Sequence, residues 1–329
     1  MNKTKRIIAV IGVPRSGTSA VAKGLESIGV NLGSYVPSVC REDNEKGFFE
    51  DLEINAIDIA MLNSVGYRWG NPVSPLFNEE SRRILSIFFP IAKNIISKRL
   101  ESDALFGFKD PLISILLPFW KEIFKELKAD VDFVIVNRNP LSMAKSLQKA
   151  EPYLDKIVCL YIWTAGMLSS IIHTAGYKRI TVDYDELIKD PIKQLERLNY
   201  KLDIGSLGEN EAMIKYKEEF LSDSLRHNNY SDEDILSDAD VPPKIAELYF
   251  LLKSLAKDEA FWEDTGTSAA INKIYSWVEE FRSTLLFIQA QSDALLSLRG
   301  ALIEKDKKIN ELTAALDEKE NQKIKRYNA

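Results

Sequence analysis

The chain has 329 residues, a net charge of −6 and 45% apolar residues. This length accommodates one large domain with an appendage, and the negative charge argues against a broadly basic nucleic-acid-binding surface. Its two cysteines, Cys40 and Cys159, are too few for a disulfide framework and lie in no metal-ligand spacing, so we expect a reducing compartment and no metal.

Apolar runs alternate with helical periodicity along the first two thirds of the chain. The predicted strands are Ile7–Gly12, Val131–Val136 and Arg179–Asp183, and a further apolar strand ends at Lys109. The predicted helices are Gly17–Ile28, Ile54–Met61, Ile113–Leu127, Leu141–Lys149 and Lys156–His173. Strands that alternate with helices predict an α/β fold, with a P-loop-type parallel sheet and helices on both faces.

The longest apolar stretch, Ile84–Ile96, does not predict a membrane span, because Pro90, Lys93 and Asn94 interrupt it. The apolar strand that begins at Ile7 is too short for a secretory core. We therefore expect a cytoplasmic protein without a transmembrane segment.

Residues 263–329 are predicted to form a long, coiled-coil-like helix after a domain at residues 1–262. An apolar residue recurs every seven positions in this row: Ile274, Phe281, Ile288, Leu295, Leu302, Ile309 and Leu316. Sustained heptads predict a helix that hides one stripe against another helix, so we expect a homo-oligomer formed through the tail. The alternative is a helix that folds back on its own domain.

A glycine-containing loop lies between the first strand and its helix. Its sequence is Gly12-Val13-Pro14-Arg15-Ser16-Gly17-Thr18-Ser19. The N-terminus of the helix offers unpaired N–H groups that suit a phosphate. A Walker A loop carries lysine where this chain has Thr18, and the cation here is Arg15 inside the loop, which argues against an ordinary ATPase. A purely structural turn with a chance arginine is the alternative.

The segment Pro14-Arg15-Ser16-Gly17-Thr18 resembles the 5′-phosphosulfate loop of sulfotransferases that use 3′-phosphoadenosine 5′-phosphosulfate (PAPS). The resemblance implies that Arg15 faces the bridging oxygen that leaves with the nucleotide. It also implies that the 5′-phosphate is held by Ser16, Gly17, Thr18 and Ser19. In this family, carbohydrate and protein-tyrosine members often have arginine where small-molecule members have lysine.

A second motif follows the strand Val131–Val136. Arg138 comes after the strand, where ligands of open α/β sheets bind, and its guanidinium suits a phosphate dianion. Ser146 follows eight residues later. The spacing resembles the family's 3′-phosphate motif, in which the arginine and the serine hold that phosphate. A surface arginine and a solvated helix serine are the alternatives.

Two weaker similarities lie nearer the C-terminus, and the resemblance as a whole ends near residue 230. The segment Thr181–Leu187 resembles the family's tyrosine–acidic–leucine segment, which implies that Tyr184 lies against adenine. The segment Ser224-Leu225-Arg226-His227 resembles one in bacterial members, which implies that Arg226 reaches the 3′-phosphate. A core tyrosine and a helix-surface arginine are the alternatives.

The base that takes the acceptor proton is expected to be a carboxylate, because neither His173 nor His227 lies in a matching motif. In the segment after the first helix, Glu50 is the leading candidate for this base and Asp51 is the second. The alternative for Glu50 is an acidic residue that favours a helix N-terminus without any chemistry.

The segment Phe108-Lys109-Asp110-Pro111 supplies the other catalytic candidates. Its position resembles the lysine-bearing strand end of the family, which implies that Lys109 contacts the transferring sulfuryl oxygens. Asp110 would orient that lysine or act as the base itself. A surface Lys–Asp turn before proline is the alternative.

Together these patterns predict a sulfotransferase of the bacterial, carbohydrate-sulfotransferase-like kind, with PAPS as co-substrate, no metal and a hydroxyl acceptor on a carbohydrate. Two alternatives stay open: a P-loop kinase or other ATP-binding protein, and a catalytically silent scaffold that works through its coiled coil.

Overall fold

The computed structural model describes residues 5–33, 49–67, 71–73, 78–205, 211–221 and 230–327. The chain forms two compact units, Met1–Glu280 and Phe281–Ala329. Arg226 and the segment Ser224–His227 lie outside the described residues, so the implied role of Arg226 stays a prediction.

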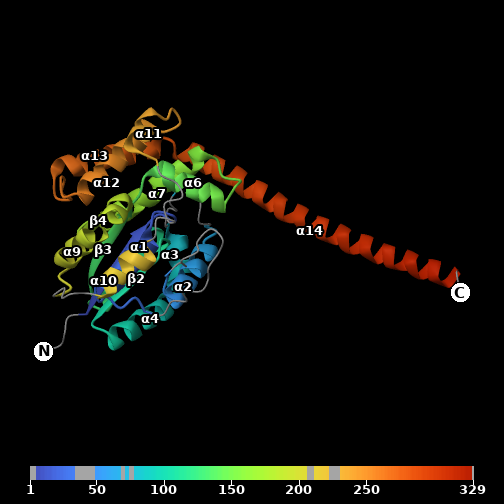
Figure 1. Ribbon diagram of the computed structural model, residues 1–329, viewed down its shortest axis with the longest axis horizontal. Helices are drawn as coiled ribbons and strands as arrows, with labels where there is room; N and C mark the ends of the chain where they lie inside the picture. Colours follow the sequence, from blue (N-terminus) through green and yellow to red (C-terminus); the bar gives the residue numbers. More distant parts are fainter. Residues whose placement is uncertain are drawn as a thin grey trace. The chain divides into compact units, whose positions relative to one another are not determined.

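A four-stranded parallel sheet in the order β2-β1-β3-β4 forms the centre of the first unit (Figure 1). The strands are β1 (Arg6–Gly12), β2 (Leu105–Lys109), β3 (Asp130–Asn137) and β4 (Lys178–Asp183). β1 pairs with β3 from Arg6 opposite Asp130 to Gly12 opposite Val136, so the carboxyl ends of these strands are neighbours. The strands are buried almost throughout, as parallel strands covered on both faces are.

Helices cover both faces of this sheet, as the alternating pattern predicted. On one face, α1 (Thr18–Ser27) and α9 (Pro191–Leu202) share a core with Ile8 and Val10 of β1. The helices α5 (Ile113–Glu126), α7 (Lys156–His173) and α12 (Pro243–Ala256) contact the sheet outside that core. The α/β fold class is therefore confirmed.

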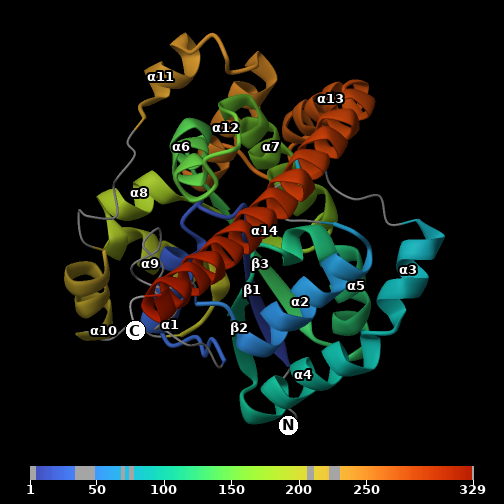
Figure 2. The same cartoon turned by 90° about the vertical axis from the view of Figure 1, so that its right-hand side faces the viewer.

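Smaller helices complete the first unit. α2 (Leu52–Ser64), α3 (Glu79–Ser86) and α4 (Phe89–Ser102) lie on the β2 side (Figure 2). The others are α6 (Pro140–Ala150), α8 (Tyr184–Lys189), α10 (Glu211–Lys215), the π-helical η1 (Tyr216–Phe220), α11 (Asp232–Ser237) and α13 (Thr265–Glu280). Each strand and helix predicted for the first unit is present.

Among the described residues, one helix, α7, is long and apolar enough to cross a membrane by length and composition alone. Within the first unit 61% of it is buried, and it packs on β1, β3 and α5. This burial in the core accounts for its apolar composition.

The heptad row of the tail is divided between two helices. Ile274 and Val278 of α13 are buried in the first unit, and Trp277 stacks on Tyr161 with 6.0 Å between ring centroids. α13 packs on α12, so the compact units divide after Glu280, and the expected domain boundary at residues 262/263 stays a prediction. The second unit contains the long helix α14 (Arg282–Tyr327). Four residues of the heptad row in this helix are 58–67% exposed: Leu295, Leu302, Ile309 and Leu316. Leu298 and Leu312, each three positions after a member of the row, are 68% and 55% exposed.

Candidate functional site

The carboxyl ends of all four strands carry the predicted site residues. Parallel strands end at the same edge of a sheet, so segments far apart in sequence meet there. The loop after β1 brings Arg15, β2 ends at Lys109, Arg138 follows β3 and Tyr184 follows β4.

The loop predicted to bind a phosphate depends on two glycines with backbones that other residues rarely adopt. Gly17 has a φ of 90°, and a Cβ there would overlap the ring of Tyr184. Gly12 has a φ of 150°, and a Cβ there would lie 2.9 Å from the carbonyl oxygen of Val136. Thr18 then begins α1, which has no side-chain cap on its first N–H groups. A tight loop leading into an uncapped helix start is suited to a phosphate.

Arg15 connects the two predicted nucleotide motifs. Its φ of 72° is left-handed, a conformation that costs a non-glycine residue about 1–3 kcal/mol. Its Nε donates a hydrogen bond to Ser146 Oγ at 3.1 Å, and its carbonyl oxygen accepts one from Arg138 Nη1 at 2.8 Å. The structure therefore brings Arg15, Arg138 and Ser146 together although they come from two separate strand–loop–helix units.

The guanidinium of Arg138 is buried and incompletely paired. Arg138 is only 7% exposed, its Nε has no hydrogen-bond partner, and within the described part of the chain no carboxylate forms an ion pair with it. Burial lowers the pKa of Arg138, against the opposing influence of Tyr184 and Asp185. Buried polar groups without a partner are rare in native proteins, and an anionic ligand would supply the missing acceptor.

Tyr184 lies in the wall of this site. It is buried, its ring packs against Gly17, and the Arg138 guanidinium lies 4.7 Å from its ring centroid. Such an arginine–aromatic contact stabilises the cation and fixes its plane. Tyr184 is thus buried like a core tyrosine, and it also lies beside the predicted nucleotide site.

The hydroxyls of the loop differ in their surroundings. Ser16 is fully buried, and its Oγ and backbone N–H both donate to the carbonyl oxygen of Val13, at 2.5 and 3.1 Å. Its hydroxyl therefore stabilises the turn. Thr18 and Ser19 lie in the first turn of α1, and Pro14 lies at the opposite end of the loop beside a small cavity.

Among the residues predicted for the acceptor side, Lys109 at the end of β2 forms an ion pair with Glu50. The lysine side chain is 3% exposed and that of Glu50 is 14% exposed. Phe49, immediately before it, has a left-handed φ of 57°, so a strained turn presents Glu50 to the lysine.

Asp51 has a structural role. Its Oδ1 accepts hydrogen bonds from the N–H groups of Glu53 and Ile54, which caps the N-terminus of α2. Its Oδ2 accepts from Arg99 Nε at 2.9 Å, and the carboxylate is buried. Asp51, and not Glu50, is therefore the acidic residue that stabilises the helix N-terminus. Glu50 remains the candidate base of this segment.

Asp110 is buried directly after Lys109. Its Oδ1 accepts from the N–H of Leu112 at 2.8 Å and its Oδ2 from Asn55 Nδ2 at 2.9 Å. Burial, and then the charge of Glu50, raise the pKa of Asp110 to about 6. With 1% of its surface exposed, it has little access to an acceptor hydroxyl.

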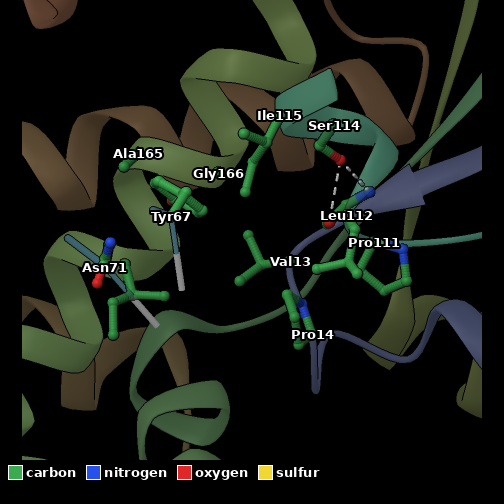
Figure 3. A pocket seen from close by; sticks show the side chains of 12 residues that line it. Val13, Pro14, Tyr67, Asn71, Pro111, Leu112, Ser114, Ile115, Ala165 and Gly166 are labelled. Atoms are coloured by element: carbon green, nitrogen blue, oxygen red, sulfur yellow. Dashed lines mark hydrogen bonds between the residues drawn. The ribbon is translucent and has the colours of Figure 1, made fainter. Parts of the chain in front are cut away.

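A cavity of about 30 Å³ adjoins the phosphate loop and the turn after Asp110 (Figure 3). Its walls are mostly apolar and include Val13, Leu112 and Ile115. The Ser114 hydroxyl is bonded to the N–H and the carbonyl of Gly12, both at 3.2 Å. A space of this size holds about two water molecules or a small apolar group, not a sugar ring.

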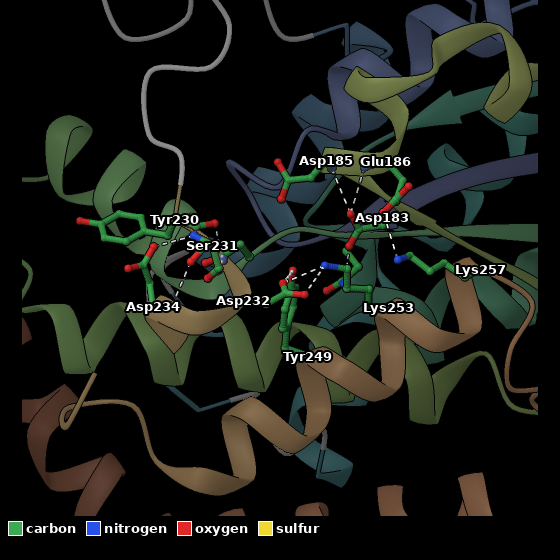
Figure 4. Close-up of polar contacts among 12 residues, drawn as sticks. Asp183, Asp185, Glu186, Tyr230, Ser231, Asp232, Asp234, Tyr249, Lys253 and Lys257 are labelled. Atoms are coloured by element: carbon green, nitrogen blue, oxygen red, sulfur yellow. Dashed lines mark hydrogen bonds and ion pairs between the residues drawn. The ribbon is translucent and has the colours of Figure 1, made fainter. Parts of the chain in front are cut away.

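Two polar residues beside the site were not singled out from the sequence. Asp183, at the end of β4, accepts from the N–H groups of Asp185 and Glu186 (Figure 4) and from Asn137 Nδ2. Burial, and then Asp185, raise its pKa to about 6. An acidic residue just before a helix is a recognisable cap signal, so the sequence contained this information.

Asn139 is the other missed residue. Its Oδ1 caps α6, and its Nδ2 donates to the carbonyl oxygens of Tyr230 and Ser231 at 2.9 and 3.2 Å. It therefore holds the segment that starts at Tyr230 next to Arg138. The Asn-Pro pair at a helix start could have indicated the cap, whereas its contact with Tyr230 has no sequence signal. Among the described residues, no cluster of three His, Cys, Asp or Glu could hold a metal ion.

No protein-family model and no curated protein sequence matches the chain. Similar solved structures include the sulfotransferase domain of the olefin synthase of Synechococcus PCC 7002, with a TM-score of 0.41 and 17% identity over 79% of this chain and 96% of that domain. The sulfotransferase domain from the curacin biosynthetic pathway has a TM-score of 0.41 and 12% identity over 84% of this chain and 99% of that domain.

A sugar kinase from Janibacter sp. HTCC2649 is also similar, with a TM-score of 0.35 and 18% identity over 61% of this chain and 96% of that one. Overall similarities at this level do not distinguish sulfuryl transfer from phosphoryl transfer. The structures that this chain resembles thus include sulfotransferase domains, and its own function has to be inferred from the side chains at the strand ends.

Proposed function

We propose that this protein transfers a sulfuryl group from PAPS to a hydroxyl acceptor. The observation that carries the proposal is the joining of Arg15, Arg138 and Ser146 at one sheet edge, with the buried Arg138 Nε lacking a partner. A nucleotide with phosphates at both its 5′ and 3′ positions matches two adjacent cationic groups, one at a helix N-terminus and one after the neighbouring strand.

The residues present fit this co-substrate. The glycines and the start of α1 would hold the 5′-phosphate, while Arg138 and Ser146 would hold the 3′-phosphate. When bound, PAPS supplies an activated sulfuryl group. Arg15 would then neutralise charge on the departing phosphate, and Lys109 would neutralise charge on the sulfuryl oxygens.

Glu50 is proposed as the base that removes the acceptor proton. It is paired with Lys109 and retains some exposure, whereas Asp110 is held by two donors and has almost none. A base has to come within hydrogen-bonding reach of the hydroxyl, which favours the more accessible carboxylate.

The acceptor is proposed to be a carbohydrate hydroxyl in the cytoplasm, with self-association through α14. The small apolar cavity beside the loop favours a second acceptor class, an alcohol whose neighbouring group is a short alkyl chain. A screen with labelled PAPS should therefore pair free and lipid-linked sugars with simple alkyl and aryl alcohols. Label transfer to sugars alone would support the carbohydrate acceptor, and transfer to alcohols alone would replace it.

A thermal-shift comparison tests the nucleotide assignment. Adenosine 3′,5′-bisphosphate at about 100 times its Kd should stabilise the protein by about 2.7 kcal/mol, while ATP with Mg²⁺ should have little effect. Stabilisation by ATP with Mg²⁺ alone would favour a kinase, and no response to either nucleotide would favour a silent scaffold. The Arg138→Gln variant, which keeps a polar side chain but loses the charge, is the matched control.

A further inference from the structure

A second buried carboxyl group lies against Asp110. Asp58, on α2, has no exposed surface, and its Oδ1 accepts a hydrogen bond from Trp120 Nε1 of α5 at 2.8 Å. Its Oδ2 is buried and receives no N–H or hydroxyl donor. Asn55, three residues before Asp58 on the same face of α2, donates a hydrogen bond to Asp110 Oδ2 at 2.9 Å, which places Asp58 beside Asp110.

When two carboxyl groups lie side by side away from water, each disfavours the charge of the other, which raises the pKa of one of them. Asp110 already accepts from Leu112 N and Asn55 Nδ2, and both bonds stabilise its charged form. Asp58 has an oxygen without a donor, and a proton on this oxygen turns it into a donor toward Asp110. Burial, followed by the charge of Asp110, raises the pKa of Asp58 well above its usual value.

We propose that Asp58 is a positioning residue that stays protonated and donates a hydrogen bond from Oδ2 to Asp110. The pair ties three parts of the chain together: α2, the turn after β2, and α5 through Trp120. α2 starts just after Glu50, and Asp110 directly follows Lys109, so this bond holds the two ends of the Glu50–Lys109 ion pair in register. The effect on catalysis rests on the proposed function, but the shared proton does not.

The charged groups that surround the pair define how it responds to pH. The charge of Asp110 acts on Asp58, the charges of Glu50 and Lys109 act on Asp110, and Trp120 and Asn55 add neutral donors. In the unfolded chain an aspartate has a pKa of about 3.9. Because the folded protein holds the proton more tightly, the stability from this pair is complete below about pH 4 and is lost as the pH rises through the folded-state pKa.

The first test measures thermal stability against pH for the wild type and Asp58→Asn. The amide keeps the acceptor for Trp120 and the donor for Asp110 but cannot lose a proton. From about pH 6 to about pH 9, above the pKa of about 6 for Asp110, the wild-type Tm should fall more steeply than that of Asp58→Asn. Trp120→Phe, which perturbs the same carboxyl group without removing it, should lower Tm but keep the wild-type slope. If Tm changes with pH equally in the wild type and in Asp58→Asn, the proposal that Asp58 holds a proton is wrong.

The second test measures PAPS-dependent kcat near neutral pH. Asp58→Asn should retain most of the activity, while Asp58→Ala should lose about 10-fold or more, as expected when a buried hydrogen bond to a charged group is removed. Equal losses in the two variants would overturn the positioning role. If neither the wild type nor any variant transfers a sulfuryl group from PAPS, the proposed function is wrong. If the dependence of Tm on pH still differs between the wild type and Asp58→Asn, the protonated Asp58 is supported independently.

Discussion

The two sides of the strand-end site treat charge in opposite ways. On the proposed nucleotide side, Arg15 and Arg138 meet, and one buried guanidinium nitrogen of Arg138 has no partner. On the acceptor side, Lys109 is paired with Glu50, and Asp110 is held by donors from Asn55 and Leu112. One side is built to receive an anion, and the other already satisfies its own charges.

This difference teaches which property each side controls. A buried cation with an unpartnered donor, such as Arg138, gains most of its stabilisation when an anion binds, so its removal should weaken nucleotide affinity. A site that is already paired is preorganised, so changes there should lower the rate while nucleotide binding persists.

The largest effect is expected for Glu50→Gln. The amide keeps the shape of the side chain but cannot accept a proton, so kcat should fall by about 10²–10⁴-fold while the affinity for adenosine 3′,5′-bisphosphate stays unchanged. Steady-state kinetics and calorimetric titration measure the two quantities. If Asp110→Asn shows the large loss and Glu50→Gln does not, the roles of these two carboxylates have to be exchanged.

Arg15→Ala should follow, with kcat reduced by about 10²–10³-fold, because a charge-stabilising donor acts mainly in the transition state. Nucleotide affinity should fall less than kcat. Ser146→Ala is the matched control, because it removes the partner of Arg15 Nε but leaves the cation in place. A variant that lacks Arg15 and still turns over at the wild-type rate would exclude this arginine from the chemistry.

Arg138→Ala should act on affinity. Loss of a charge-assisted hydrogen bond costs about 1.5–3 kcal/mol, so Kd for adenosine 3′,5′-bisphosphate should rise about 10–150-fold, with little change for AMP. Ser142→Ala, in the helix α6 that follows Arg138, removes a contact to Tyr230 N and should leave the discrimination between the two nucleotides intact. An unchanged Kd for the bisphosphate in Arg138→Ala would show that the motif has been misassigned.

The smallest effect on the site is expected from removal of the tail. Truncation after Glu280 keeps α13, which packs in the first unit, and removes the exposed apolar row of α14. Soluble monomers rarely expose a long apolar stripe, so the full chain should self-associate, most simply as a dimer, and the truncated one should not. Light scattering at micromolar concentration measures this, with Leu302→Lys in the full chain as a point-mutant control. If the full chain is a monomer, the prediction of a dimer formed through α14 is wrong.

The sequence by itself determined what depends on neighbours along the chain. Periodicity placed the strands and the helices α1, α2, α5, α6 and α7, but not α9 and α12, which also contact the sheet. The loop from Gly12 to Gly17 and the spacing from Arg138 to Ser146 each lie within one strand–loop–helix unit. Local backbone preferences and side-chain periodicity carry this information over short distances.

The tertiary structure decided which groups are paired and buried. The bond between Arg15 and Ser146, the ion pair of Asp51 with Arg99, and the bond of Asp58 with Trp120 all join residues far apart in sequence. The sequence around Asp58 is that of a surface residue in a helix, and only packing against α5 shields it from solvent. The heptad row likewise continues through Phe281, but Ile274 lies in α13, which packs on α12, and is buried, whereas Leu302 of α14 is exposed. Burial depends on which neighbour the fold supplies and not on the period alone.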